Sequence, residues 1–83
     1  MKIEELKKYE GKKVVANRKD KAVSIGILHI EGNMVVFESN NVEIFPVKGN
    51  PRITHRGPLR MYASLITDVS PTGAEQSKDA ERR

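Results

Sequence analysis

The sequence has no cysteine and no tryptophan, and aromatic residues make up only 5% of its 83 residues. Without cysteine the chain has no disulfide framework, no thiolate zinc or iron–sulfur site and no cysteine nucleophile. Two histidines are too few to hold a structural zinc ion by themselves. We therefore expect a protein without a metal or cofactor. The scarcity of aromatic side chains also argues against a sheet that stacks several bases, as RNA-recognition motifs and cold-shock domains do.

Long apolar runs and the sequence motifs of catalysis are absent too. No run approaches the ~20 apolar residues of a membrane-spanning helix, and residues 1–9 are charged where a secretory signal is apolar. The sequence has no nucleophile elbow, no phosphate-binding glycine loop and no pair of metal-ligand motifs. We therefore expect a soluble, cytoplasmic protein that is not an enzyme and has neither a membrane partner nor a small-molecule substrate.

The short chain forms one domain at most, and its charge is distributed unevenly. Its 15 basic and 11 acidic residues give a net charge of +4. Residues 70–83 contain three acids, three bases and no apolar residue larger than alanine, which predicts a flexible, disordered tail. The positive charge therefore belongs to residues 1–69, the predicted domain, and it attracts polyanions. A core this small contributes only about 3–5 kcal/mol, so we expect association with further copies to stabilise it.

Hydrophobic periodicity predicts a helix followed by short strands. Apolar residues at helical spacing predict a helix over residues 2–10, and Gly11 ends it. Five β-rich runs follow, at residues 14–15, 23–30, 34–37, 42–47 and 59–69. Residues 48–58, with two prolines and two glycines, are assigned mostly to a loop, although 52–55 has the pattern of a short strand.

The second run is apolar on both alternating faces around Gly26. This pattern predicts a long strand that is buried on both faces and sharply bent at the glycine. Gly32 and Asn33 then form a two-residue hairpin turn, because glycine accepts the positive φ of the first type II′ position. Bent strands of this kind curl into a small antiparallel barrel.

These residues resemble a known family. Residues 6–28 (LKKYEGKKVVANRKDKAVSIGIL) are similar to the first half of the Sm1 motif, with Gly26 and Leu28 in its second strand. Arg56 and Gly57 are similar to the Arg-Gly pair of the Sm2 motif, although they follow a long connection and precede a proline. The turn at residues 31–33 is shorter than the Asp-x-x-x-Asn turn of the family. The chain thus resembles the Sm and Sm-like (LSm, Hfq-related) proteins.

The resemblance implies a fold, an assembly and a ligand. The fold is a short N-terminal helix followed by a strongly bent, five-stranded antiparallel Sm-like (SH3-type) barrel. Sm-like subunits form homo-oligomeric rings by pairing the fourth strand of one subunit with the fifth of the next. The rings bind single-stranded RNA through the loop between strands two and three and through the Arg-Gly loop. Ring closure also removes exposed sheet edges, which suits a chain with a thin core.

Six residues are candidates for nucleic-acid contact, each with a structural alternative. An arginine beside a glycine offers charge and a stacking plane, although it also suits a solvated turn. A histidine stacks on a base or faces water, an asparagine reads a base edge or serves its hairpin turn, and lysines bind phosphates or merely solubilise a surface. The candidates are Arg56, Gly57, His55, Asn33, Lys12 and Lys13.

Two functions remain open at this point. The first is a non-catalytic Sm-like ring that binds single-stranded nucleic acid, RNA rather than DNA, and supports its processing or turnover. The alternative is an SH3-like barrel that acts as a protein–protein assembly module without binding nucleic acid, because small barrels serve many tasks.

Overall fold

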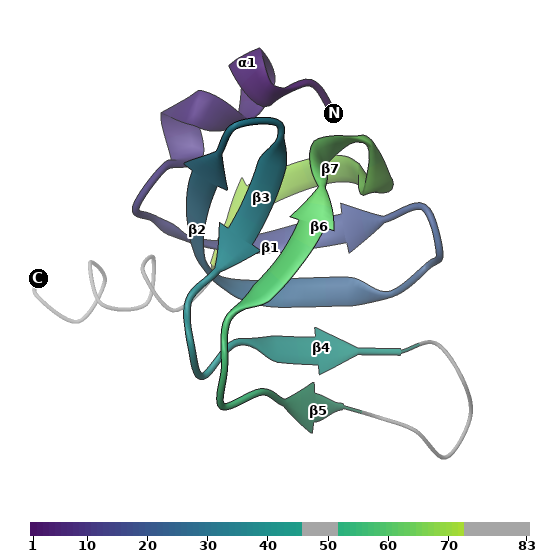
Figure 1. Cartoon of the computed structure of the whole chain (residues 1–83). Helices are drawn as coiled ribbons and strands as arrows, with labels where there is room; N and C mark the ends of the chain where they lie inside the picture. Colours follow the sequence, from purple (N-terminus) through teal and green to yellow (C-terminus); the bar gives the residue numbers. More distant parts are fainter. Residues whose placement is uncertain (46–51, 73–83) are drawn as a thin grey trace, which may run out of the picture.

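The computed structural model describes residues 1–45 and 52–72. Within these ranges the chain forms a short helix, seven strands and two 3-10 turns (Figure 1). In chain order the elements are α1 (Ile3–Leu6), η1 (Lys7–Tyr9), β1 (Lys13–Arg18), β2 (Val23–Glu31), β3 (Met34–Phe37), β4 (Val42–Ile44), β5 (Ile53–Thr54), β6 (Leu59–Tyr62), η2 (Ala63–Leu65) and β7 (Ile66–Pro71). All pairings of the described strands are antiparallel. The predicted mainly β fold with a short N-terminal helix is confirmed.

The N-terminal α-helix is shorter than the predicted range 2–10, because α1 ends at Leu6 and the chain continues as the 3-10 turn η1 before Gly11. Leu6 is fully buried in the core cluster, which also contains Leu28. After the 3-10 turn η1, Gly11 has a φ of +77°, a conformation that glycine adopts without a steric penalty. Its N–H donates to the carbonyl oxygen of Leu28 at 2.7 Å, so the end of the helix is joined to β2.

Strand β2 bends because its two halves pair with different strands. Its first half pairs with β4, with Val23 opposite Ile44, whereas its second half pairs with β3. Gly26 lies where the partner changes, and a Cβ atom there would lie 3.0 Å from the Asn41 Cβ and 3.4 Å from a ring carbon of Phe37. The predicted bend therefore occurs where only glycine leaves room for both neighbours.

The hairpin turn between β2 and β3 agrees with the prediction. Glu31 pairs with Met34, which leaves Gly32 and Asn33 as the two loop residues. Gly32 has a φ of +63°, whereas Asn33 is not among the residues with positive φ. A positive φ at the first loop position alone is the pattern of a type II′ turn.

The strand count differs from the prediction, since the described residues form seven strands rather than five. The predicted strand 59–69 is divided into β6 and β7 by η2, because the chain leaves its partner β3 and turns to pair with β1. The predicted loop 48–58 contains the two-residue strand β5, which pairs with β4. Residues 46–47 of the fourth predicted strand and residues 48–51 of that loop lie outside the described residues.

The folded part also extends beyond the predicted boundary at residue 69. Ser70 and Pro71 belong to β7 and pair with Val15 and Val14 of β1. Thr72 is 5% exposed, and its N–H donates to a β1 carbonyl at 3.4 Å. The edge of β1 thus pairs with this segment although Ser70 and Thr72 are polar and Pro71 has no N–H to donate. The remainder of the predicted tail, residues 73–83, lies outside the described residues.

Burial on both faces of β2 was predicted, and the structure contradicts this prediction. The side of β2 that contains Ser24, Gly26 and Leu28 is buried. The opposite side, which we call the outer face, continues onto β1 and β4 and is only partly buried. Its six aliphatic residues are Val15, Val23, Ile25, Ile27, Val42 and Ile44.

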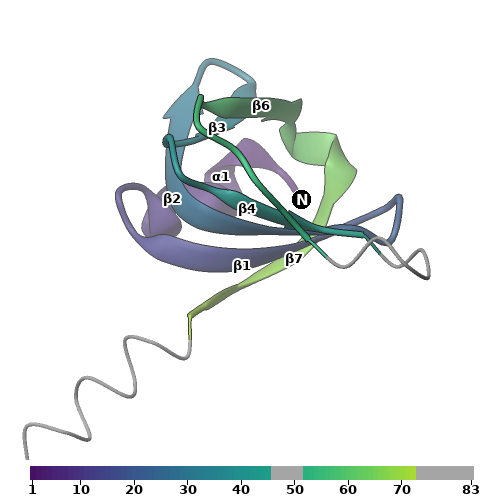
Figure 2. The same ribbon diagram turned by 90° about the horizontal axis from the view of Figure 1, so that it is seen from below.

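The core lies inside the curve of the sheet, and α1 lies at one end of this curve, where Leu6 joins the core (Figures 1 and 2). The strand order is β5-β4-β2-β1-β7, with β3 pairing the far half of β2 and β6 pairing β3. Among the described strands, β5, β6 and β7 each have a single partner, so the sheet is not closed. The fully buried large side chains include Leu6, Val14, Leu28, Val35, Phe37 and Ile66.

Candidate functional site

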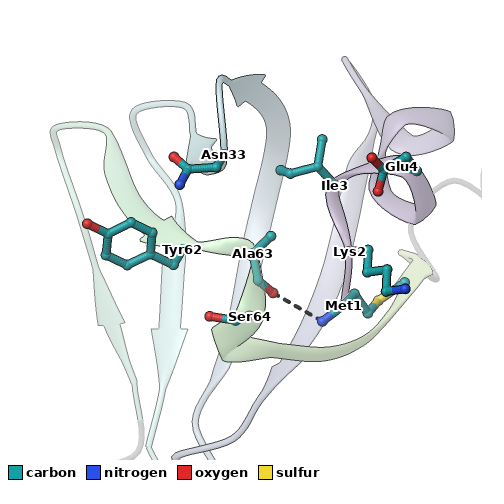
Figure 3. A pocket seen from close by; sticks show the side chains of 8 residues that line it. All are labelled: Met1, Lys2, Ile3, Glu4, Asn33, Tyr62, Ala63 and Ser64. Atoms are coloured by element: carbon teal, nitrogen blue, oxygen red, sulfur yellow. Dashed lines mark hydrogen bonds between the residues drawn. The ribbon is translucent and has the colours of Figure 1, made fainter.

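An open recess of about 400 Å³ lies where three segments meet. The segments are the N-terminal residues up to the first turn of α1, the β2–β3 turn, and the end of β6 with η2 (Figure 3). Eight residues line the recess, namely Met1, Lys2, Ile3, Glu4, Asn33, Tyr62, Ala63 and Ser64. Sequence segments about thirty residues apart thus contribute to one surface feature.

Pairing between β3 and β6 brings the turn asparagine close to an aromatic ring. Met34 pairs with Tyr62, so the turn residue Asn33 lies directly beside the end of β6. The Tyr62 residue is 60% exposed, a high value for a large apolar ring. The amino group of Met1 donates to the carbonyl oxygen of Ala63 at 3.1 Å and also to that of Ile66, which fixes the opposite wall.

The recess combines an apolar floor with groups that recognise a polar planar ligand. The Asn33 amide offers both donors and an acceptor, the Tyr62 ring offers a stacking surface, and the Lys2 ammonium offers positive charge. Figure 3 draws one hydrogen bond among the lining residues, between Met1 and Ala63, so the other lining residues leave the Asn33 amide unoccupied. These groups suit an unpaired base with its phosphate nearby.

The structure does not bring the predicted site residues together. Asn33 lies in the recess, beside the Tyr62 end of the β3–β6 ladder. Arg56 and Gly57 form an exposed bend before Leu59, at the opposite end of the same ladder. The recess therefore has Tyr62, Ala63 and Ser64 beside the hairpin turn, where the family resemblance predicted an Arg-Gly pair.

The other three predicted residues lie in two further places. Lys12 and Lys13 are exposed at the start of β1. His55 follows β5, and its Nε2 lies 2.7 Å from a carboxylate oxygen of Glu43 on β4. His55 therefore belongs to a part-buried polar cluster, away from the recess.

This polar cluster is centred on a buried ion pair that sequence reasoning missed. The side chains of Arg18 and Glu43 are each 9% exposed and form a salt bridge. Arg18 also donates to Ser24 at 3.1 Å and holds Asp20 through two hydrogen bonds. Arg18 ends β1 and Glu43 lies in β4, so no local sequence pattern connects them.

The cluster is electrostatically self-contained. Burial alone would raise the pKa of Glu43, but hydrogen bonds from Arg18 and His55 outweigh burial and hold the pKa below its usual value. Burial likewise opposes the charge of Arg18, yet its bonds to Asp20 and Glu43 raise its pKa. The bond to Arg18 also lowers the pKa of Asp20. The cluster joins β1, β2 and β4, and its charges are satisfied internally, so we assign it a structural role.

His29 is held between two carboxylates. Its Nδ1 lies 2.9 Å from Glu10, and its Nε2 contacts Glu38. The hydrogen bonds to Glu38 and Glu10 raise the pKa of His29, because two carboxylates favour the imidazolium form. His29 thus forms a surface bridge between the chain before β1 and the chain after β3.

The described surface has more unpaired positive than negative charge. Five described acids each contact an arginine or histidine, namely Glu10, Asp20, Glu31, Glu38 and Glu43. In contrast, no lysine among residues 1–45 forms an ion pair with another described residue. These lysines are Lys2, Lys7, Lys8, Lys12, Lys13, Lys19 and Lys21.

Tyr62 and Lys2 are the recess residues that sequence reasoning did not select. The available signal for Tyr62 was its alternation with Met61 and its shared face with Arg60, since a ring on the charged face of a strand has few structural uses. Lys2 carried no signal, because its proximity to Asn33 depends on where the sheet places the N-terminal segment.

In residues 1–45 and 52–72, no helix has the length and hydropathy needed to cross a bilayer. The same ranges contain no cluster of three histidine, cysteine or acidic side chains arranged to bind a metal ion. No model of a known protein family matches the sequence, and no curated protein matches it.

Proposed function

We propose that this chain is a subunit of an Sm-like ring that binds single-stranded nucleic acid, RNA rather than DNA, without catalysing a reaction. The observation that carries the proposal is the recess, which places the Asn33 amide and the exposed Tyr62 ring on one surface. An amide that reads a base edge and a ring that stacks on the base are the usual elements of single-stranded RNA recognition.

The arrangement of the strands supports the Sm-like part of the proposal. Strand β4 follows β3 after residues 38–41, and β6 follows β5 after residues 55–58. Both pairs lie side by side, since β4 pairs with β5 and β3 pairs with β6. If β3 and β4 are counted as one bent strand, and β5 and β6 as another, the chain has a short helix followed by five strands. This is the order that the family resemblance implies.

The free edges support assembly. Strands β6 and β7 each use one edge within the described fold, which leaves a row of backbone donors and acceptors on the other edge. Pairing β6 of one subunit with β7 of the next satisfies both rows and repeats around a ring. In such a ring one recess per subunit presents a repeated set of base sites.

Charge supports a polyanionic ligand. Most described acids contact an arginine or histidine, whereas the lysines of the first 21 residues form no ion pair with a described acid. Free lysines near Lys12 and Lys13 suit phosphates along a strand, and their contribution falls as salt concentration rises. Arg56 is a further phosphate contact in this proposal, separate from the recess.

The test combines mass in solution with RNA binding. Light scattering of the protein alone and with a short U-rich RNA measures the oligomer and the bound RNA together. We expect a closed multimer that gains the mass of RNA at physiological salt. A monomer would contradict the ring, and a multimer that ignores RNA and DNA would contradict the ligand.

A matched pair of variants locates the site. Loss of one stacking ring costs about 1–3 kcal/mol per base, so Tyr62→Ala should weaken RNA binding by about 5- to 150-fold. Ile53→Ala is the control, because Ile53 is also an exposed large apolar residue, at 41%, but lies away from the recess. Equal affinities of the two variants would remove the recess from the proposal. Matched RNA and DNA oligonucleotides then test whether the 2′-hydroxyl is recognised.

A further inference from the structure

The outer face is a continuous aliphatic surface on three neighbouring strands. Val15 on β1 lies opposite Ile25 on β2, which in turn lies opposite Val42 on β4. Val23 lies opposite Ile44 one step along the same face. Directly opposed residues have Cβ atoms ~4.5–5.5 Å apart, so these side chains form one contiguous patch.

No described element covers this face. The core lies on the other side of the sheet, inside its curve, and α1 lies at one end of that curve (Figures 1 and 2). Residues 73–83, which lie outside the described ranges, contain no aliphatic side chain larger than alanine. A sheet face that is aliphatic and uncovered marks a surface that another element buries.

The dimensions of the patch match those of a helix. Three strands at ~4.8 Å spacing place β1 and β4 about 10 Å apart, close to the ~10–12 Å diameter of an α-helix. Along β2 the patch extends from Val23 to Ile27, or about 13 Å at ~3.3 Å per residue. A helix of two to three turns covers this length.

The surroundings of the patch specify the charge of the occupant. Lys13 lies opposite Ile27 at one end of the patch, and Lys19 and Lys21 lie in the β1–β2 turn at the other end. None of these lysines forms an ion pair with a described residue. Among the acids at its borders, Glu10 and Glu38 contact His29, and Asp20 pairs with Arg18. Asp68 keeps its charge, since it only accepts a hydrogen bond from the neutral Asn17 amide, but the three lysines outnumber it.

We infer that the outer face is a docking surface for a short amphipathic helix of a partner protein, with an aliphatic stripe flanked by acidic residues. Bases stack on aromatic rings, and the six residues of the patch are all aliphatic, which favours a protein over a nucleic acid. Two copies meeting face to face would bring unpaired lysines together, which disfavours a second copy as the occupant. The inference does not rest on the recess, which lies beyond the opposite end of β2, but it shares Lys13 with the phosphate contacts proposed above.

The test uses two synthetic helical peptides with the same leucine stripe at positions i, i+3, i+4 and i+7. One carries glutamate at the flanking positions and the other carries lysine. Nuclear magnetic resonance shifts of the ¹⁵N-labelled protein locate the binding site, and fluorescence anisotropy measures the affinity. We expect the acidic peptide to shift residues of β1, β2 and β4 and to bind at least about tenfold more tightly than the lysine peptide.

Two variants and a control connect binding to the patch. Ile25→Asp should lower the affinity for the acidic peptide at least about tenfold. Ile53→Asp should leave this affinity unchanged, because Ile53 lies opposite Glu43 and faces the other side of the sheet. The double variant Lys13→Glu with Lys21→Glu leaves the aliphatic residues intact. It should lower the affinity for the acidic peptide and make that affinity less dependent on salt concentration. Well-dispersed amide spectra confirm that each variant is folded.

Several results would overturn the inference. These are no binding of the acidic peptide, equal binding of both peptides, or shifts outside β1, β2 and β4. Vesicles containing phosphatidylserine that bind the face in place of the peptide would identify a lipid surface as its occupant. Assembly through the face in light scattering, lost in Ile25→Asp, would identify a second copy.

Discussion

Replacing Gly26 with alanine tests the account of the bent strand β2. The new Cβ would lie 3.0 Å from the Asn41 Cβ and 3.4 Å from a Phe37 ring carbon. Neither neighbour moves easily, because Phe37 is fully buried and the Asn41 amide donates to the carbonyl oxygens of Glu38 and Gly57. Overpacking a core costs about 1–3 kcal/mol, and alanine regains about 0.5–1 kcal/mol over glycine within a strand. We therefore expect Gly26→Ala to lower the free energy of unfolding by about 1–2 kcal/mol.

Urea unfolding with Gly57→Ala as the control measures this loss. A Cβ at Gly57 meets no atom within 4 Å, and the φ of Gly57 is not positive. This control should therefore be neutral or more stable by up to about 1 kcal/mol, through the entropy of the unfolded chain. The slope m should stay constant in both variants, so the midpoints report stability directly. A Gly26→Ala midpoint equal to that of Gly57→Ala would refute the steric reasoning.

Three further predictions concern the core and the two charged clusters. Leu6→Ala should cost about 2–5 kcal/mol and release the helix, seen as a lower melting temperature and reduced helical circular dichroism; an unchanged melting temperature would contradict the role of Leu6. Glu43→Gln should lower the free energy of unfolding in urea by about 2–3 kcal/mol. This is less than the loss expected for an isolated buried ion pair, because Asp20 still contacts Arg18. An unshifted urea midpoint would argue against the bridge. His29 has a raised pKa in the folded state, so its contribution to stability is fully present below its unfolded pKa and is lost as pH rises through its folded pKa. The stability advantage of the wild type over His29→Gln should therefore shrink from acid to alkaline pH, and a constant difference would contradict the assignment.

Local features of the fold were predictable because glycine has a distinct conformational range. Gly11 and Gly32 adopt positive φ where the sequence predicted a helix end and a type II′ turn. Gly26 lies at the bend of β2 because its neighbours leave no room for a side chain. Each of these predictions depends on a few adjacent residues and on one steric rule.

Features that depend on distant contacts were not predictable. Strand β5 has only two residues, and it is a strand because β4 lies beside it. Ser70 and Pro71 are polar or strand-breaking in isolation, yet they complete β7 through their pairing with β1. The sequence therefore indicated where the strands begin more reliably than where they end.

The candidate site was predictable only in part, for the same reason. Asn33 was selected from its turn and lies in the recess, but Tyr62 joins it through the pairing of β3 with β6. Arg56 was selected from a short motif, and the same pairing places it at the other end of the ladder. A motif of two residues does not specify the register of strand pairing, and that register decides which loops lie close together.

The position of β1 between β2 and β7 also has a consequence for how the chain folds. Asn17 and Asp68, which are hydrogen-bonded across β1 and β7, are 51 residues apart in the sequence. Forming this pairing requires closing a long loop, and such non-local contacts slow folding. During synthesis one edge of β1 stays bare until β7 has left the ribosome, and a bare edge favours pairing with other chains. We therefore expect folding to finish only after nearly the whole chain has been made, and chains cut before Ile66 to aggregate.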